Sequence, residues 1–176
     1  MESEYKKTNE EKIINHFFES VHSKTGTAMR AVFKKAHNPD TEYQCWEYLA
    51  KYRVNIESSK ERLPYITVFS SIANSDKSTD GSLGFGKALM VAYDSDRESE
   101  PARARLRRVL ACDSTVEVCT ILRSILRFIT GKGIGISYAS LLKDLKNFDI
   151  VPEKVKAKWA QQFYEIKQKE DEEAEE

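Results

Sequence analysis

The residues of this chain best suited to chemistry are arginines, and residues 102–110 (ARARLRRVL) hold four of them. With about 100° between successive residues of a helix, the alanine and aliphatic residues of this segment gather on one side. The arginines spread over the other side: Arg103, Arg105, Arg107 and Arg108. A guanidinium stays charged, and its planar fork can bind two phosphate oxygens at once. The segment therefore predicts a helix with a cationic surface, and no acidic residue within it neutralises that charge.

Further cations follow in the next predicted helix. Arg123 and Arg127 are four residues apart and share one face, and Lys132 comes directly after that helix. From residue 101 to residue 132 there are seven cationic residues against Asp113 and Glu117. Two interpretations remain open: binding to a phosphate backbone, or ordinary solvated surface that is neutralised elsewhere in the fold.

A smaller basic face is predicted earlier in the chain, where Arg30 and Lys34 lie one turn apart beside Lys35. A basic helical face without base-reading geometry gains affinity by releasing counterions from phosphates. Binding by these cations is therefore expected to ignore nucleotide sequence and to weaken steeply as salt rises.

Residues 81–87 (GSLGFGK) match the glycines and the lysine, Lys87, of a phosphate-binding P-loop. The match ends at Ala88, where a P-loop needs a serine or threonine to hold magnesium. The preceding residues (SDKSTD) are also not a buried strand. Nucleotide hydrolysis is therefore not expected, although Lys87 remains a candidate phosphate contact.

The histidines and cysteines do not form a recognisable reactive site. His16, His22 and His37 lack the four-residue spacing of a zincin pair, and no carboxylate cluster completes a metal site. The three cysteines lack a CxxC spacing and lie in apolar helical patterns, which predicts reduced core residues: Cys45, Cys112 and Cys119. We expect neither a metal nor a cofactor, and no enzymatic activity.

The elements that must position the cations are predicted to be helices, because apolar residues recur at spacings of three and four and only 7 glycines and 4 prolines interrupt them. Thr8 with Glu11, and Ser114 with Glu117, are capping boxes, and Thr27 is predicted to cap the second helix. Ser137 is expected to cap a later helix, and Pro101 and Pro152 to begin two others. Residues 63–73 (LPYITVFSSIA) suit a strand as well as a buried helix, and we predict a helix.

The overall prediction is an all-α protein of two packed helical bundles, residues 1–95 and 96–168, followed by a disordered acidic tail, residues 169–176. Six of the last seven residues are acidic, so the rest of the chain has 28 cationic and 22 acidic residues and a net charge of +6. The tail is expected to act mainly as a solubilising end. The sequence predicts no export signal and no membrane anchor, and hence a cytoplasmic protein.

Several ordered pieces resemble one family, the small subunit of the type I-E CRISPR surveillance complex Cascade. Residues 83–89 (LGFGKAL) resemble its short glycine-containing segment, residues 105–112 (RLRRVLAC) its arginine helix, and residues 122–126 (LRSIL) the helix after it. Residues 136–145 (ISYASLLKDL) and 155–164 (VKAKWAQQFY) resemble its two closing helices. The early segment differs, because the family tends to place two adjacent arginines after Ala-x-Leu, whereas this chain has Ala28, Met29, Arg30 and Ala31.

The resemblance implies an all-helical, non-enzymatic subunit that is paired with a second copy along the inner face of the complex. It implies contacts with the backbone subunits, the large subunit, the guide RNA and the target DNA, chiefly the displaced single strand. The expected phosphate contacts are then Arg30, Lys34, Lys35, Lys87, Arg103, Arg105, Arg107, Arg108, Arg123, Arg127 and Lys132. A rival interpretation stays open, in which the protein is a helical interaction scaffold and its arginine face binds acidic surfaces of protein partners.

Overall fold

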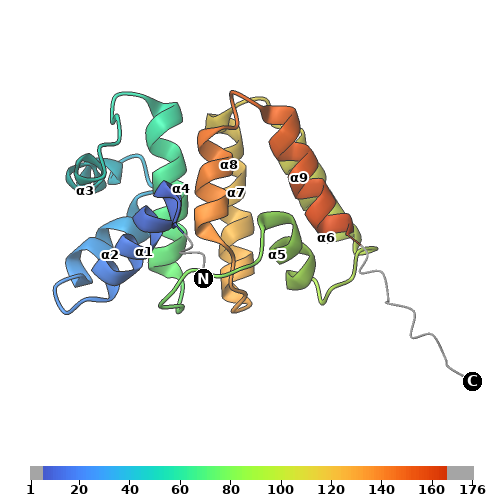
Figure 1. Ribbon diagram of the computed structural model, residues 1–176, viewed down its shortest axis with the longest axis horizontal. Coiled ribbons are helices and arrows are strands. Elements are labelled where there is room, and N and C mark those ends of the chain that lie inside the picture. The colour runs from blue at the N-terminus through green and yellow to red at the C-terminus, as the bar shows by residue number, and fades with distance from the viewer. Residues whose placement is uncertain (1–5, 166–176) are drawn as a thin grey trace, which may run out of the picture.

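The computed structural model describes residues 6–165, which fold into helices and irregular segments (Figure 1). The elements are α1 (Asn9–His22), α2 (Thr27–Lys35), the 3-10 helix η1 (Glu42–Cys45), α3 (Trp46–Lys51), α4 (Ser59–Asn74), α5 (Phe85–Ala92), α6 (Glu100–Leu110), α7 (Thr115–Gly131), α8 (Tyr138–Lys146) and α9 (Pro152–Tyr164). Within the described range the only β-type pairing is an isolated bridge between Leu83 and Ile136. The predicted all-α class is confirmed, and the predicted acidic tail lies outside the described residues.

The first predicted capping box is confirmed. Thr8 Oγ1 accepts a hydrogen bond from the Glu11 amide at 3.2 Å, and the Glu11 carboxylate accepts one from the Thr8 amide at 2.6 Å. Ser114 caps α7 in the same way, at 3.2 Å from the Glu117 amide. The Glu117 carboxylate, however, accepts from the amide of Asp113 at 2.8 Å, one residue before the cap.

The cap predicted for the second helix is wrong. Thr27 is the first residue of α2, and the N-cap is Gly26, which makes no side-chain hydrogen bond. A Cβ at Gly26 would lie 2.0 Å from the carbonyl oxygen of Ser20. Glycine is needed because the start of α2 passes directly over the end of α1, and this close approach fixes where α2 begins.

α4 is buried over most of its length. Its residues 63–73 are all buried, because α1, α2, α7 and α8 pack around it (Figure 1). A helix that is covered on every side needs no polar face. This is why its sequence showed no clear helical periodicity, and the prediction of a helix over residues 63–73 is confirmed.

The glycine-rich segment is used for helix packing. The Gly86 amide donates to Gln162 Oε1 at 3.1 Å, and a Cβ at Gly86 would lie 1.9 Å from the carbonyl oxygen of Trp159. A Cβ at Gly84 would lie 2.3 Å from Gln162 Nε2. The glycines that resembled a P-loop therefore allow α5 to approach the backbone of α9 closely.

Gly86→Ala is expected to lower the free energy of unfolding by about 1–3 kcal/mol, because α5 and α9 must move apart to accept the new methyl group. Urea unfolding followed by circular dichroism measures this change. The matched control is Gly131→Ala at the end of α7, where a Cβ meets nothing within 4 Å and alanine suits a helix better. Equal unfolding midpoints for the two variants would contradict the packing explanation.

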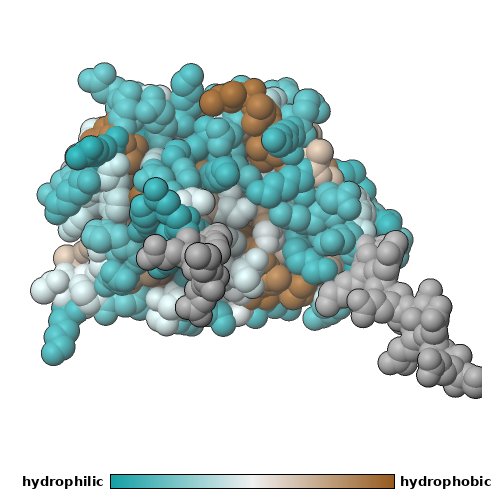
Figure 2. Space-filling model, in the orientation of Figure 1, coloured by the Kyte–Doolittle hydropathy of each residue, from teal (hydrophilic) through white to brown (hydrophobic). Residues whose placement is uncertain are grey.

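α7 and α8 form the middle of the molecule, with α1 to α4 on one side and α5, α6 and α9 on the other (Figure 1). A single cluster of buried apolar residues runs through these helices. α5, which was assigned to the first bundle, packs on α9, α7 and α6 of the second. The division at residue 95 stays a prediction. Figure 2 shows a largely polar face with apolar atoms gathered over the turn between α8 and α9.

Candidate nucleic-acid interface

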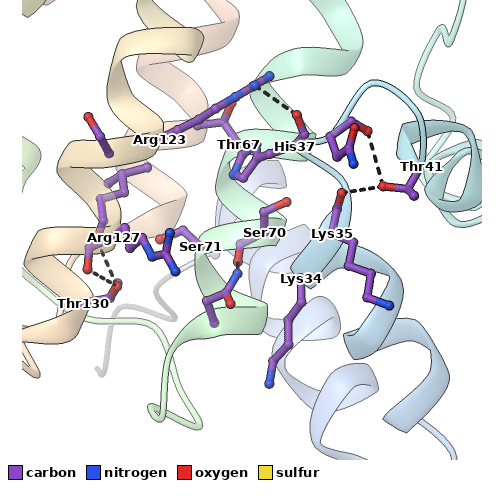
Figure 3. A pocket seen from close by; sticks show the side chains of 14 residues that line it. Lys34, Lys35, His37, Thr41, Thr67, Ser70, Ser71, Arg123, Arg127 and Thr130 are labelled. Carbon is purple, nitrogen blue, oxygen red and sulfur yellow. Dashed lines mark hydrogen bonds between the residues drawn. The ribbon is translucent and has the colours of Figure 1, made fainter.

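A pocket of about 570 Å³ opens between α2, α4 and α7, and four of the predicted cations line it (Figure 3). Lys34 and Lys35 come from the last turn of α2, on one side of the pocket. Arg123 and Arg127 come from α7, on the opposite side. These segments are almost ninety residues apart in the sequence. We call this site, with its four cations, the basic pocket.

Local sequence explains why the four cations point here. α7 buries a stripe of apolar residues against α4, and Arg123 and Arg127 lie beside that stripe, one turn apart. Lys34 and Lys35 occupy the C-terminal turn of α2, where the helix dipole favours positive charge. Because α2 and α7 both pack on α4, the two pairs of cations face the same space.

Arg123 joins the two sides of the basic pocket. Its Nη1 donates to the backbone carbonyl of His37 at 3.1 Å, as Figure 3 shows, while its Nε is buried without a partner among the described residues. Burial, and then the positive charge of Arg123, lower the pKa of His37 to about 4. His37 is therefore neutral at physiological pH, and all the fixed charges that line the pocket are positive.

A second hollow of about 440 Å³ continues the basic pocket, since Asn74, Arg127 and Thr130 line both. The loop after α4 contributes Lys77 and Asp76 to this hollow. Sequence reasoning missed Lys77, because nothing local distinguishes a lysine in a polar loop from any other. Only the packing of this loop beside the end of α7 brings it next to Arg127.

Arg30 does not line the basic pocket. Its Nε donates to the carbonyl of Ala73 at 3.0 Å and its Nη2 to the carbonyl of Ser75 at 2.9 Å. It therefore satisfies carbonyl groups at the C-terminal end of α4, where intrahelical partners run out. Its predicted contact with phosphate stays a prediction.

The arginines of α6 lie on two flanks of its buried stripe. On one flank Arg103 Nη2 pairs with Glu98 at 2.5 Å, and Arg107 pairs with Glu100. The expectation that no nearby carboxylate neutralises these arginines is therefore wrong for this flank. The acidic partners, Glu98 and Glu100, precede Pro101 in the sequence.

The other flank of α6 faces α7. The Arg105 guanidinium lies 4.4 Å from the centre of the Phe128 ring and 5.6 Å from that of Tyr93, and its Nη1 is buried without a hydrogen-bond partner in the described chain. Lys132 Nζ lies 5.7 Å from the same Phe128 ring, and Arg108 is exposed one turn after Arg105. Positive charge thus surrounds the last turns of α7, which also carry Arg127.

Lys87 lies half-buried on α5 and lines neither hollow. The structure therefore brings together Lys34, Lys35, Arg123 and Arg127 at the basic pocket, and Arg105 and Lys132 at Phe128. It places Arg30, Lys87, Arg103 and Arg107 elsewhere. Their contact with nucleic acid stays a prediction.

The described residues offer little for covalent or metal chemistry. Burial raises the pKa of the Cys45 and Cys119 thiols to about 12 and that of Cys112 to about 11, so all three stay protonated and are poor nucleophiles. Their predicted place in the core is confirmed. Between residues 6 and 165 no three His, Cys, Asp or Glu side chains are grouped to hold a metal ion. In that same range no helix is both long and apolar enough to cross a membrane.

Comparison with known families shows that residues 29–164 match the family of the CRISPR-associated protein Cse2. No curated protein and no solved structure matches the chain. The matched range is well over half of the chain, and it contains every cation predicted above, from Arg30 to Lys132. The matched range includes the glycine segment, the arginine helix and the closing helices that carry the resemblance. The chain therefore belongs to the Cse2 family, the small subunits of the type I-E CRISPR Cascade.

Proposed function

We propose that this protein is a non-catalytic, nucleic-acid-binding subunit of Cascade that stabilises the opened target by holding the displaced DNA strand. The observation that carries this proposal is the convergence of two pairs of cations, from α2 and α7, on one pocket. A single strand follows a positively charged groove through its phosphates, whatever its base sequence. The neighbouring hollow with Lys77 extends this surface past Arg127, and further cations lie around Phe128, the next residue of α7.

The energetic role of such a groove follows from the balance of target opening. The guide heteroduplex is about as stable as the DNA duplex that it replaces, so opening is a nearly balanced exchange. A contact that exists only in the opened state shifts this exchange by its full free energy. A charge-assisted contact contributes about 1.5–3 kcal/mol, so two or three phosphate contacts favour the open state strongly.

The protein acts within an assembly in this proposal. We propose that it is cytoplasmic, lies beside a second copy of itself, and contacts the guide-bound backbone subunits and the large subunit. Apolar atoms over the turn between α8 and α9 support protein contacts (Figure 2). In the sequence this turn contains Ile150, which is 74% exposed, and Val151, which is 40% exposed. Exposed aliphatic residues that adjoin one another mark interaction surfaces more often than isolated ones do.

The same patch favours a second candidate function, a helical interaction scaffold whose arginines bind acidic protein surfaces. Under this alternative the protein assembles through apolar contacts and its cations serve protein partners. Assembly would then resist salt, and charge changes in the basic pocket would leave DNA binding by the complex unchanged.

Neutralising two cations of the basic pocket, with Lys34→Gln and Arg127→Gln together, is expected to weaken single-strand binding and to flatten its salt dependence. The loss of two phosphate contacts should reduce the slope of log affinity against log salt by about 1.4. Fluorescence anisotropy with a labelled single strand across a salt series measures both quantities, first with the purified chain and then with the assembled complex.

The matched control combines Lys60→Gln and Lys154→Gln. Both lysines are exposed in the first turns of α4 and α9 and line neither hollow, so this variant has the same net charge. The control should bind like the wild type. Equal slopes for the two double variants in the complex would rule out the basic pocket as the strand site and would support the scaffold.

A further inference from the structure

Four buried polar atoms of the basic pocket have no hydrogen-bond partner among the described residues. They are Arg123 Nε on α7, His37 Nδ1 in the loop after α2, and Thr67 Oγ1 and Ser70 Oγ on α4. Ser70 is fully buried, whereas Arg123 and His37 are half-buried. Unpaired buried polar atoms are rare in folded proteins, and four from three separate segments at one pocket indicate a site shaped for a polar ligand.

The charges around His37 decide which ligand suits this place. Arg123 faces it from α7, Lys34 and Lys35 lie on α2 in the same pocket, and Arg127 lies one turn from Arg123. On the remaining side is Glu42 of η1, which is already held by Arg62 at 2.6 Å. Cations therefore outnumber acidic groups here, and a small anion fits the site best.

His37 is neutral in the free protein, because burial and the charge of Arg123 hold its pKa at about 4. A neutral imidazole has one nitrogen that can only accept a hydrogen bond. A phosphodiester has acceptors but no donor. If such a group lies between the Arg123 and His37 side chains, its negative charge offsets the positive charge of Arg123. The protonated His37 ring then gains an anionic partner.

We propose that one phosphodiester group of the bound strand enters the basic pocket between Arg123 and His37, and that His37 takes up a proton from solvent as it enters. This inference rests on the proposed function. A small rotation of the half-buried His37 and Arg123 side chains presents their unpaired nitrogens to the phosphate. The basic pocket is then a specific phosphate seat whose occupancy is linked to one proton.

Proton uptake makes binding depend on pH in a defined direction. If binding restores the pKa of His37 to its ordinary value of about 6.5, single-strand affinity should rise about tenfold as pH falls from about 7.5 to about 5.5. At about pH 6, binding should take up about 0.7 proton per strand. The sign follows from the free state, which binds fewer protons than the bound state throughout this range.

The experiment uses the assembled complex and a labelled single strand at constant ionic strength, and compares the wild type with His37→Gln. Glutamine does not titrate, and Arg123 bonds to the backbone carbonyl at position 37, so the substitution keeps that bond. His22→Gln is the control, because His22 is exposed at the end of α1 and does not line the basic pocket. Calorimetry in two buffers with different ionisation enthalpies counts the protons directly.

We expect the tenfold rise and the proton uptake in the wild type and in His22→Gln, and neither in His37→Gln. Binding by all three proteins with the same pH profile and the same proton uptake would overturn the phosphate seat at His37 and leave the proposed function intact. Binding that is also indifferent to Lys34→Gln with Arg127→Gln would overturn the proposed function itself, and the phosphate seat with it.

Discussion

Trp159→Ala is expected to lower the free energy of unfolding by about 3–5 kcal/mol. Trp159 is completely buried, and its ring centre lies 5.0 Å from that of Phe85 on α5 and 5.9 Å from that of Phe148. Alanine leaves a large cavity where α5, α9 and the end of α8 meet. Urea unfolding measures the loss, which corresponds to a fall in melting temperature on the order of 10 °C.

A second contribution to this loss is polar. Trp159 Nε1 donates to the buried carboxylate of Asp144 at 2.8 Å, and Lys158 holds the same carboxylate at 2.8 Å and 3.0 Å. Without the indole, Oδ2 of the Asp144 carboxylate loses a hydrogen-bond donor, which lowers the free energy of unfolding by about 1–3 kcal/mol.

Trp159→Phe separates the two contributions, because it keeps most of the apolar contact and removes only the donor. Its expected loss is about half that of Trp159→Ala or less. A loss below about 1 kcal/mol for Trp159→Ala would contradict the importance of this contact for the fold.

Reversing two exposed cations, Arg108 on α6 and Lys132 beside Phe128, with Arg108→Glu and Lys132→Glu together, is expected to weaken capture of the displaced strand by the complex on the order of 100-fold. The estimate takes about tenfold for each lost charge-assisted contact. Both residues are exposed, so the fold should tolerate the change. The measurement is the fraction of target DNA opened as a function of complex concentration, with circular dichroism of the free chain as the test of folding.

The control for this prediction is Lys60→Glu with Lys154→Glu, which has the same net charge. Both lysines are exposed, in the first turns of α4 and α9, and neither is an expected phosphate contact. This variant should open target DNA nearly as well as the wild type. An equal defect in both variants would mean that net charge alone matters.

The α6 arginines show how far local sequence could reach. The spacing in residues 102–110 correctly predicted an amphipathic helix that buries Ala102, Leu106 and Val109. Which arginines remain unpaired depended on Glu98 and Glu100, which precede residues 102–110, and on Phe128, which belongs to another helix. Ion pairs and ring contacts are decided by side-chain distances that helical periodicity does not contain.

The glycine segment shows the opposite case, in which a motif resembled one function and served another. Three glycines and Lys87 have the spacing of a P-loop. The structure uses Gly84 and Gly86 to bring α5 against α9, more than seventy residues later. Glycine permits close backbone approach in both settings, and only the missing strand and Ala88 distinguished them in the sequence.

The sequence by itself determined the all-helical class, several caps and the family, because these depend on local periodicity and on the order of short segments. Tertiary structure alone decided which cations meet. The basic pocket joins Lys34 and Lys35 to Arg123 and Arg127 because α2 and α7 both pack on α4. Tertiary structure also decided that Arg30 donates to carbonyl groups at the end of α4, and that His37 and Lys77 lie beside the cations of α7. The physical reason is that helix packing places residues that are distant in sequence at one surface.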